Sequence, residues 1–166
     1  MANKMTPYEQ MMAALERAKK KDSAPRMDNG DQEHDLQCAC VKDFRSDYPA
    51  LEKLLFAVPN GGFRNKTTAG KMKAEGVTSG VSDLILLVPN KLFHGLCIEM
   101  KIIHEFTDGN GKFQRKKTYQ EPEQREWQSL VENQGYMYVV CRTEDEFKHI
   151  VDNYLSTTIY SKPTKI

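Results

Sequence analysis

Apolar and polar positions along the chain fall into short blocks whose spacing predicts the secondary structure. Apolar residues repeat three or four positions apart, as on one helix face, in these segments: residues 6–21, 32–47, 122–134 and 143–155. A short basic segment that ends before a glycine, residues 66–75, also predicts a helix. Dense apolar runs predict strands over residues 54–58, 81–88, 94–101 and 136–141. The polar stretch 104–120 predicts a long loop or a mobile hairpin, and such segments in compact domains are often functional.

The strands 81–88 and 94–101 carry ionisable residues inside otherwise apolar runs. A short Pro-Asn turn between them predicts an antiparallel hairpin, in which facing residues have a constant index sum. This register places Asp83 opposite Glu99, and Lys101 lies on the same face two residues further on. Two carboxylates and an ammonium group are therefore expected to converge at the open end of the hairpin.

Composition places these elements in one domain with a short appendage. The chain has 166 residues, 39% of them hydrophobic, with 24 Lys and Arg against 23 Asp and Glu. Residues 1–30, a helical pattern followed by a segment of linker composition at residues 22–30, are expected to form an appended arm. No apolar run approaches the roughly 20 residues of a membrane span, and the N-terminus lacks the apolar stretch of a secretion signal. We therefore expect a cytoplasmic protein with no membrane partner.

The cysteines and the basic residues refine this picture. Cys38, Cys40, Cys97 and Cys141 lack the paired spacing of a zinc site and are expected to be buried free thiols. The net charge of +1 is uninformative by itself, but basic residues cluster in segments 64–73 and 112–117, neither of which contains an acid.

The predicted convergence of Asp83, Glu99 and Lys101 has two interpretations. A carboxylate within an apolar strand is costly to bury unless it is paired or binds a metal. The first interpretation is an ion pair of Lys101 with one of the two acids that serves only the fold. The second is a Mg²⁺ site, because this ion is held by one or two carboxylates, waters and a substrate phosphate. The metal would then activate a water against a phosphodiester while Lys101 holds that water or stabilises the transition state.

The residues around this convergence resemble a known family. Gly80-Val81-Ser82-Asp83 followed by Ile98-Glu99-Met100-Lys101 resembles the Asp…Glu-x-Lys signature of the PD-(D/E)xK nuclease superfamily. The wider pattern resembles the VRR-NUC branch of phages and prophages over about residues 32–155, through Glu33-x-x-Leu36-Gln37, Pro59-Asn60-Gly61-Gly62, Glu75-Gly76-Val77, Gly95-Leu96-Cys97, Gln124 and Gly135-Tyr136. The basic stretch from Glu105 to Glu121 departs from it, since many relatives have a shorter link there.

The resemblance implies a fold, an activity and a set of site residues. The fold is a restriction-endonuclease-like α/β domain with an α-β-β-β-α-β core and a mixed sheet flanked by helices, here residues 31–156, followed by a flexible tail at 157–166. The activity is Mg²⁺- or Mn²⁺-dependent hydrolysis of DNA, selective for branched structures such as the Holliday junction, by a homodimer or other homo-oligomer. The implied catalytic residues are Asp83, Glu99, Lys101, Glu33 and Gln124, of which Asp83, Glu99 and Glu33 would hold the metal.

Nucleic-acid contacts are expected from turn and basic residues, by backbone amides and by charge: Asn60, Gly61, Arg64, Lys66, Lys71, Lys73, Lys112, Arg115, Lys116 and Lys117. Two alternatives stay open at the level of the sequence. One is a catalytically silent nucleic-acid-binding module that uses its acids structurally, and the other is a nuclease acting on RNA or on single strands.

Overall fold

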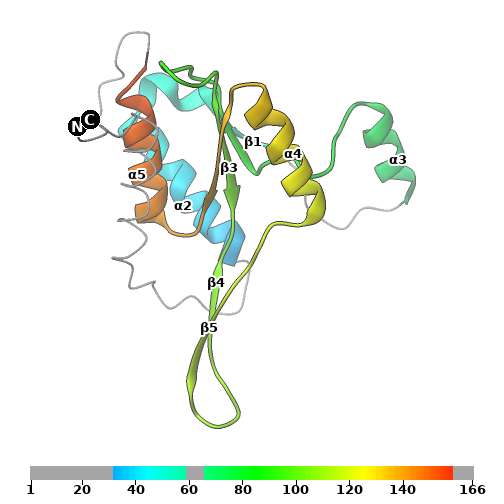
Figure 1. Ribbon diagram of the computed structural model, residues 1–166, viewed down its shortest axis with the longest axis vertical. Coiled ribbons are helices and arrows are strands. Elements are labelled where there is room, and N and C mark those ends of the chain that lie inside the picture. Colours follow the sequence, from blue (N-terminus) through cyan, green and yellow to red (C-terminus); the bar gives the residue numbers. More distant parts are fainter. Residues whose placement is uncertain (1–31, 59–65, 159–166) are drawn as a thin grey trace, which may run out of the picture.

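The computed structural model of the chain describes residues 32–58 and 66–158 (Figure 1). The predicted helix at 6–21 and the arm at 1–30 lie outside these residues. The described elements are, in chain order, α2 (Gln32–Asp47), the 3-10 helix η1 (Pro49–Leu54), β1 (Leu55–Ala57), α3 (Lys66–Ala74), β2 (Leu84–Leu86), β3 (Leu96–Met100), β4 (Ile103–Thr107), β5 (Phe113–Lys117), α4 (Pro122–Asn133), β6 (Met137–Cys141) and α5 (Glu144–Leu155).

The central sheet is mixed and has the strand order β1-β2-β3-β6. β2 pairs antiparallel with β3, with Leu84 opposite Ile98, which is the register that the sequence predicted. β3 pairs parallel with β6, which follows α4 along the chain. The strands β4 and β5 form a separate two-stranded sheet, so the stretch 104–120 is largely a hairpin, one of the two predicted alternatives.

Helices cover both faces of the central sheet. α2 and α5 lie together on one face, and α4 lies on the other (Figure 1). The expected α-β-β-β-α-β order corresponds to α2, β1, β2, β3, α4 and β6, with α5 added after it. The predicted fold class, a mixed α/β domain with helices flanking a mixed sheet, is confirmed.

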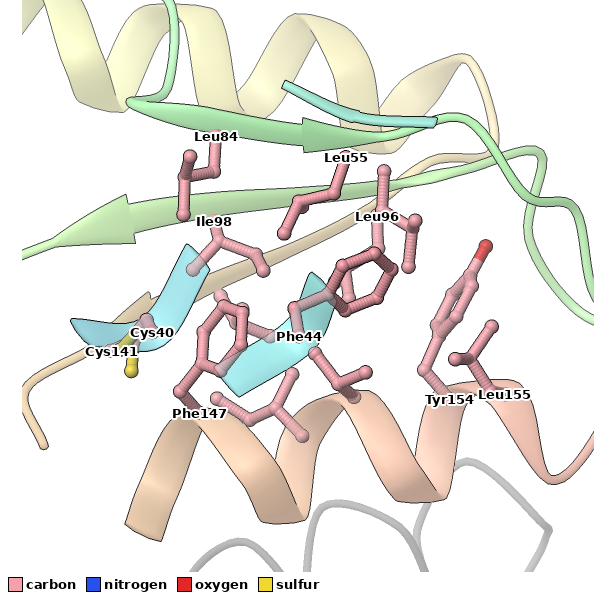
Figure 2. Close-up of a cluster of buried hydrophobic side chains, with 14 of the residues drawn as sticks. Cys40, Phe44, Leu55, Leu84, Leu96, Ile98, Cys141, Phe147, Tyr154 and Leu155 are labelled. Carbon is pink, nitrogen blue, oxygen red and sulfur yellow. The ribbon is translucent and has the colours of Figure 1, made fainter. Parts of the chain in front are cut away.

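The hydrophobic core lies between the sheet and the α2–α5 layer. Figure 2 shows Phe147 and Tyr154 of α5 pointing at the strands, where Leu84 and Ile98 point back at them. Phe44 of α2 fills the space between the two helices and the sheet, and it is buried like its neighbours. Each fully buried side chain of this size stabilises the fold by about 1.5–3 kcal/mol.

The start and end of α2 follow from local chemistry. Its first turn carries Glu33 and Asp35, whose negative charges are favoured at a helix N-terminus. The helix ends at Asp47, just before Tyr48-Pro49, because a residue that precedes proline disfavours the α conformation. At this end the Tyr48 hydroxyl donates to Asp152 Oδ1 of α5 over 2.6 Å and ties the two helices together.

Two sequence-based expectations need correction. Cys38 is exposed, whereas Cys40, Cys97 and Cys141 are buried free thiols as predicted. Cys38 lies two residues from Cys40 on α2 and so faces away from the core. At the start of the expected flexible tail at 157–166, Thr158 is buried and bridges Asn90, and residues 159–166 lie outside the described residues. Within the described part of the chain, no helix is both long and apolar enough to cross a membrane.

Candidate functional site

Asp83 lies directly before β2, at the open end of the β2–β3 hairpin. Extending the Leu84–Ile98 pairing by one residue brings it opposite Glu99. The Met100 backbone N–H donates to Asp83 Oδ2 over 2.8 Å, so the carboxylate is held by the neighbouring strand. The other carboxylate oxygen accepts no hydrogen bond from the described residues.

Glu99 is completely buried, and described side chains bond both of its carboxylate oxygens. Lys101 Nζ donates to Glu99 Oε1 over 2.6 Å, and Gln124 Nε2 of α4 donates to the same oxygen. The Tyr138 hydroxyl of β6 donates to Glu99 Oε2 over 3.2 Å. The predicted convergence on Glu99 is therefore present, and the glutamine expected to point into the site does so.

Lys101 is almost as buried as Glu99, at 7% exposure, and its ammonium group contacts several acceptors. In addition to Glu99, Nζ donates to the Met100 carbonyl over 3.0 Å. It also lies 4.0 Å from Glu33 Oε2, which approaches from the first turn of α2. Lys101 thus links α2, through Glu33, to β3, through Glu99.

Gln124 is positioned by its own helix as well as by the strand. Glu121 and Gln124 form a capping box at the start of α4, in which the Glu121 N–H donates to Gln124 Oε1 over 2.8 Å. The segment before β2 lies against the same turn. Gly80 has φ of +79°, and a Cβ on it would overlap the Glu123 carbonyl group. This close approach fixes the Asp83 segment relative to Gln124.

The carboxyl groups of the site have raised pKa values. Burial raises the pKa of Glu99 to about 7, an effect that its hydrogen bond from Lys101 opposes and the charge of Asp83 reinforces. Burial also raises the pKa of Asp83, while the Met100 N–H and Lys101 lower it. For Glu33, burial raises the pKa and Lys101 lowers it. Among the described residues, these three acids lie near one ammonium group, that of Lys101.

The donor set fits a hard divalent cation. Asp83 has an oxygen without a described hydrogen-bond donor, and its charge raises the pKa of the neighbouring Glu99. Mg²⁺ needs only one or two carboxylates, with waters and a phosphate completing its shell. Within residues 32–58 and 66–158, no group of three or more His, Cys, Asp or Glu residues is close enough to hold a metal. Asp83 and Glu99 could hold such an ion, and the role of Glu33 as a third ligand stays a prediction.

Sequence reasoning missed Tyr138. Its hydroxyl donates to Glu99 and accepts a hydrogen bond from Gln120 Nε2 over 3.1 Å, and its ring packs edge-on against Trp127. Burial, followed by the charge of Glu99, raises the pKa of Tyr138 far above its ordinary value, so the hydroxyl stays a donor. The alternation of β6 places Tyr138 on the α4 face, but only the parallel β3–β6 register brings it beside Glu99.

The predicted nucleic-acid-binding residues are spread over several elements and are only partly described. Asn60, Gly61 and Arg64 lie outside the described residues, as does the side chain of Lys66. Lys71 and Lys73 are exposed on α3. The remaining basic residues lie on the β4–β5 hairpin or its turn and are exposed: Lys112, Arg115, Lys116 and Lys117. Arg115 pairs with Glu105 at 2.9 Å.

Comparison with known proteins supports the fold. A scan against protein-family models and a search of curated proteins each gave no match. Among solved structures, the chain is similar to one described as "VRR_NUC domain protein", with a TM-score of 0.59 and 24% sequence identity. The similarity covers 83% of this chain and 99% of that chain. The resemblance predicted from the motifs is therefore confirmed at the level of structure: the chain has the fold of a VRR-NUC domain.

Proposed function

We propose that the protein is a divalent-metal-dependent nuclease that hydrolyses phosphodiester bonds in DNA. The single observation that carries this proposal is the meeting of Asp83, Glu99 and Lys101 at the end of one hairpin, with Glu99 fully buried. A fully buried acid linked to an amine and two further donors is more elaborate than an ion pair needs to be for the fold alone. The fold shared with a VRR-NUC domain protein supports the same conclusion.

In this mechanism each residue has a defined task. Asp83 and Glu99 would hold Mg²⁺ or Mn²⁺, with Glu33 as a further acid at its edge; the metal would supply Lewis-acid activation of water and neutralise phosphate charge. Lys101 holds the attacking water or stabilises the negative charge of the transition state through Nζ. Gln124 and Tyr138 orient Glu99, so they are positioning residues.

The substrate class follows from the same resemblance and from the placement of charge. We propose structured or branched DNA, including junctions, as the substrate, and a homodimer or other homo-oligomer acting in the cytoplasm of a bacterial host. The exposed lysines of α3 and of the β4–β5 hairpin support phosphate contacts that do not depend on sequence.

The direct test uses isosteric variants and a panel of labelled nucleic acids. Asp83→Asn keeps an acceptor for the Met100 N–H, and Lys101→Met keeps the length of the side chain, so both variants should fold. Each should lower the cleavage of junction, flap and duplex DNA with Mg²⁺ or Mn²⁺ by at least about 100-fold. Circular dichroism verifies the fold. Wild-type protein that leaves the whole panel intact, single-stranded DNA and RNA included, would contradict the proposal.

Glu33 offers a matched comparison on one helix. Glu33→Gln removes the acid beside Lys101, whereas Asp35→Asn removes an exposed acid two residues away. Loss of cleavage in the first variant alone would place Glu33 in the site. Calorimetric titration with Mn²⁺ separates the enzyme from a catalytically silent module. The enzyme should bind Mn²⁺ at a site that is lost in Asp83→Asn, whereas the silent module should show no such site.

A further inference from the structure

The β4–β5 hairpin begins directly after the candidate catalytic lysine and extends away from the domain. β4 starts two residues after Lys101, and Figure 1 shows the hairpin projecting beyond the rest of the described chain. Its five-residue strands reach about 17 Å at 3.4 Å per residue, which is the length of about five stacked base pairs. A nucleic acid cut beside Lys101 would therefore have its neighbouring nucleotides within reach of the hairpin.

The base of the hairpin is clamped to the central sheet. Thr118 Oγ1 accepts from the Ile102 N–H over 3.0 Å, and the Thr118 N–H donates to the Ile102 carbonyl over 3.0 Å. Arg142 Nη2, at the end of β6, donates to the Thr118 carbonyl over 3.1 Å. Because Lys101 precedes this clamp directly, the hairpin has a fixed starting direction relative to the site.

The tip of the hairpin is also ordered by its own hydrogen bonds. Asp108 Oδ1 accepts from the backbone N–H groups of Asn110 and Lys112, each over 3.0 Å. Asp108 Oδ2 accepts from Gln114 Nε2 over 3.0 Å, and these bonds lower the pKa of the carboxyl group. The hairpin is thus pre-organised at both ends, which lowers the entropy cost of binding.

Each face of the hairpin presents an exposed aromatic ring and basic side chains. The register places Phe106, His104 and Lys116 on one face, with Lys116 diagonal to the ring. Phe113 lies on the other face, where its nearer basic neighbour is Arg115, paired with Glu105, and Lys117 lies four residues along the strand. The two rings are 48% and 55% exposed, respectively.

We propose that this hairpin is a stacking arm that binds unpaired bases next to the cleavage site. The proposal rests on the proposed nuclease function and specifies its substrate: DNA with single-stranded or splayed segments beside the cut. Exposed rings on a basic element match such strands, because bases stack on aromatic faces while cations follow the phosphates. Bases inside a duplex are already stacked on one another, so an intact duplex offers these rings nothing to bind.

The test measures binding without catalysis. Fluorescence anisotropy in EDTA would compare wild type with a Phe106→Ala/Phe113→Ala variant on single-stranded, forked and blunt duplex DNA. Base stacking corresponds to about 5- to 150-fold in affinity per base. We expect at least a fivefold loss on forked and single-stranded DNA and less than a twofold change on blunt duplex. The control is Leu92→Ala, which removes a 43% exposed apolar side chain from the turn between β2 and β3, at the end of those strands away from the site.

The outcomes distinguish this inference from the proposed function. Equal affinity of variant and wild type for forked DNA, or an equal loss on all three substrates, would overturn the stacking arm. A lower sedimentation mass of the variant with unchanged DNA affinity would also overturn it, and would assign the rings to contacts between copies of the chain. Failure of the nuclease proposal would instead be seen as wild-type protein that binds DNA but does not cut it with Mn²⁺.

Discussion

At the scale of single residues, Glu99 is an acid whose burial carries a cost in stability. The side chain is fully buried, and its carboxylate accepts a hydrogen bond from the Lys101 ammonium group. The same ammonium group also lowers the pKa of Asp83 and of Glu33. A pKa of about 7 means that the folded protein binds a proton at Glu99 more tightly than the unfolded chain does. In the absence of metal, ionising this residue therefore weakens the fold.

The raised pKa of Glu99 predicts how the stability of the protein changes with pH. Because the pKa in the folded protein lies above the ordinary value of 4.5, the contribution of Glu99 is fully present below pH 4.5 and is lost as pH rises through about 7. The loss is at most about 3 kcal/mol, the equivalent of the pKa difference. In EDTA, the free energy of unfolding of Glu99→Gln should rise relative to wild type between pH 5 and pH 8, measured by urea denaturation.

A matched control removes an acid that has no such environment. Glu52→Gln changes an exposed residue of η1, and its stability difference from wild type should be nearly the same at both pH values. A Glu99→Gln difference that is equally independent of pH would contradict the prediction. Glu99→Gln should also be inactive as a nuclease, so that this variant gains stability and loses activity together.

At the scale of elements, the site depends on how closely the segment before β2 approaches α4. Gly80 and Gly76 both have positive φ, at +79° and +98°, but only Gly80 has a neighbour that a Cβ would overlap. The neighbour is backbone at Glu123, in the turn that holds Gln124. Helix α4 therefore cannot stay in place if Gly80 acquires a side chain.

The second prediction compares these two glycines. Gly76→Ala should cost about 1 kcal/mol, because positive φ alone is strained for alanine. Gly80→Ala should cost about 3 kcal/mol and lower cleavage by more than tenfold, since the overlap also displaces Gln124 from Glu99. Thermal denaturation and cleavage rates measure both effects. Equal stability and activity of the two variants would show that the approach to α4 is unimportant.

The parts of the site that the sequence predicted are local in the chain. Asp83 and Glu99 belong to one hairpin, so a constant index sum was enough to pair them. Gln124 and Glu33 are distant in the chain and came from the family resemblance; in the structure Gln124 donates to Glu99, and Glu33 lies 4.0 Å from Lys101. Helix positions followed from apolar spacing in the same way, because that signal also depends only on neighbouring residues.

The parts that the sequence did not predict depend on distant contacts. Tyr138 reaches Glu99 through the parallel β3–β6 pairing, which joins strands separated by a hairpin and a helix. Nothing in an apolar run distinguishes a tyrosine that packs from one that donates to a buried acid. The clamp between Arg142 and Thr118 is of the same kind, since it needs the end of β6 to lie beside the hairpin base.

At the scale of the whole molecule, the β4–β5 hairpin is a separable unit. It forms its own two-stranded sheet, and it contributes no residue to the hydrophobic core of the described chain. Ile102 and Thr118 already hydrogen-bond to each other at its base, so its two ends lie at the spacing of paired strands. The domain should therefore fold and keep its site without it.

Removal of the β4–β5 hairpin tests whether the domain and its site are independent of it. Replacing residues 103–117 with an Asn-Gly turn should shift the melting temperature by no more than about 4 °C, since a loss of 1 kcal/mol moves it by about 2–4 °C in a domain of this size. Cleavage of blunt duplex by the shortened protein should fall less than cleavage of forked DNA, because Asp83, Glu99 and Lys101 lie outside the removed segment and only the phosphate contacts of its basic residues are lost. Cleavage of forked DNA should fall to the duplex rate, measured on both substrates in one reaction. If duplex and forked DNA lose activity in equal proportion while the melting temperature holds, the hairpin contributes to DNA binding or catalysis generally and does not select unpaired strands.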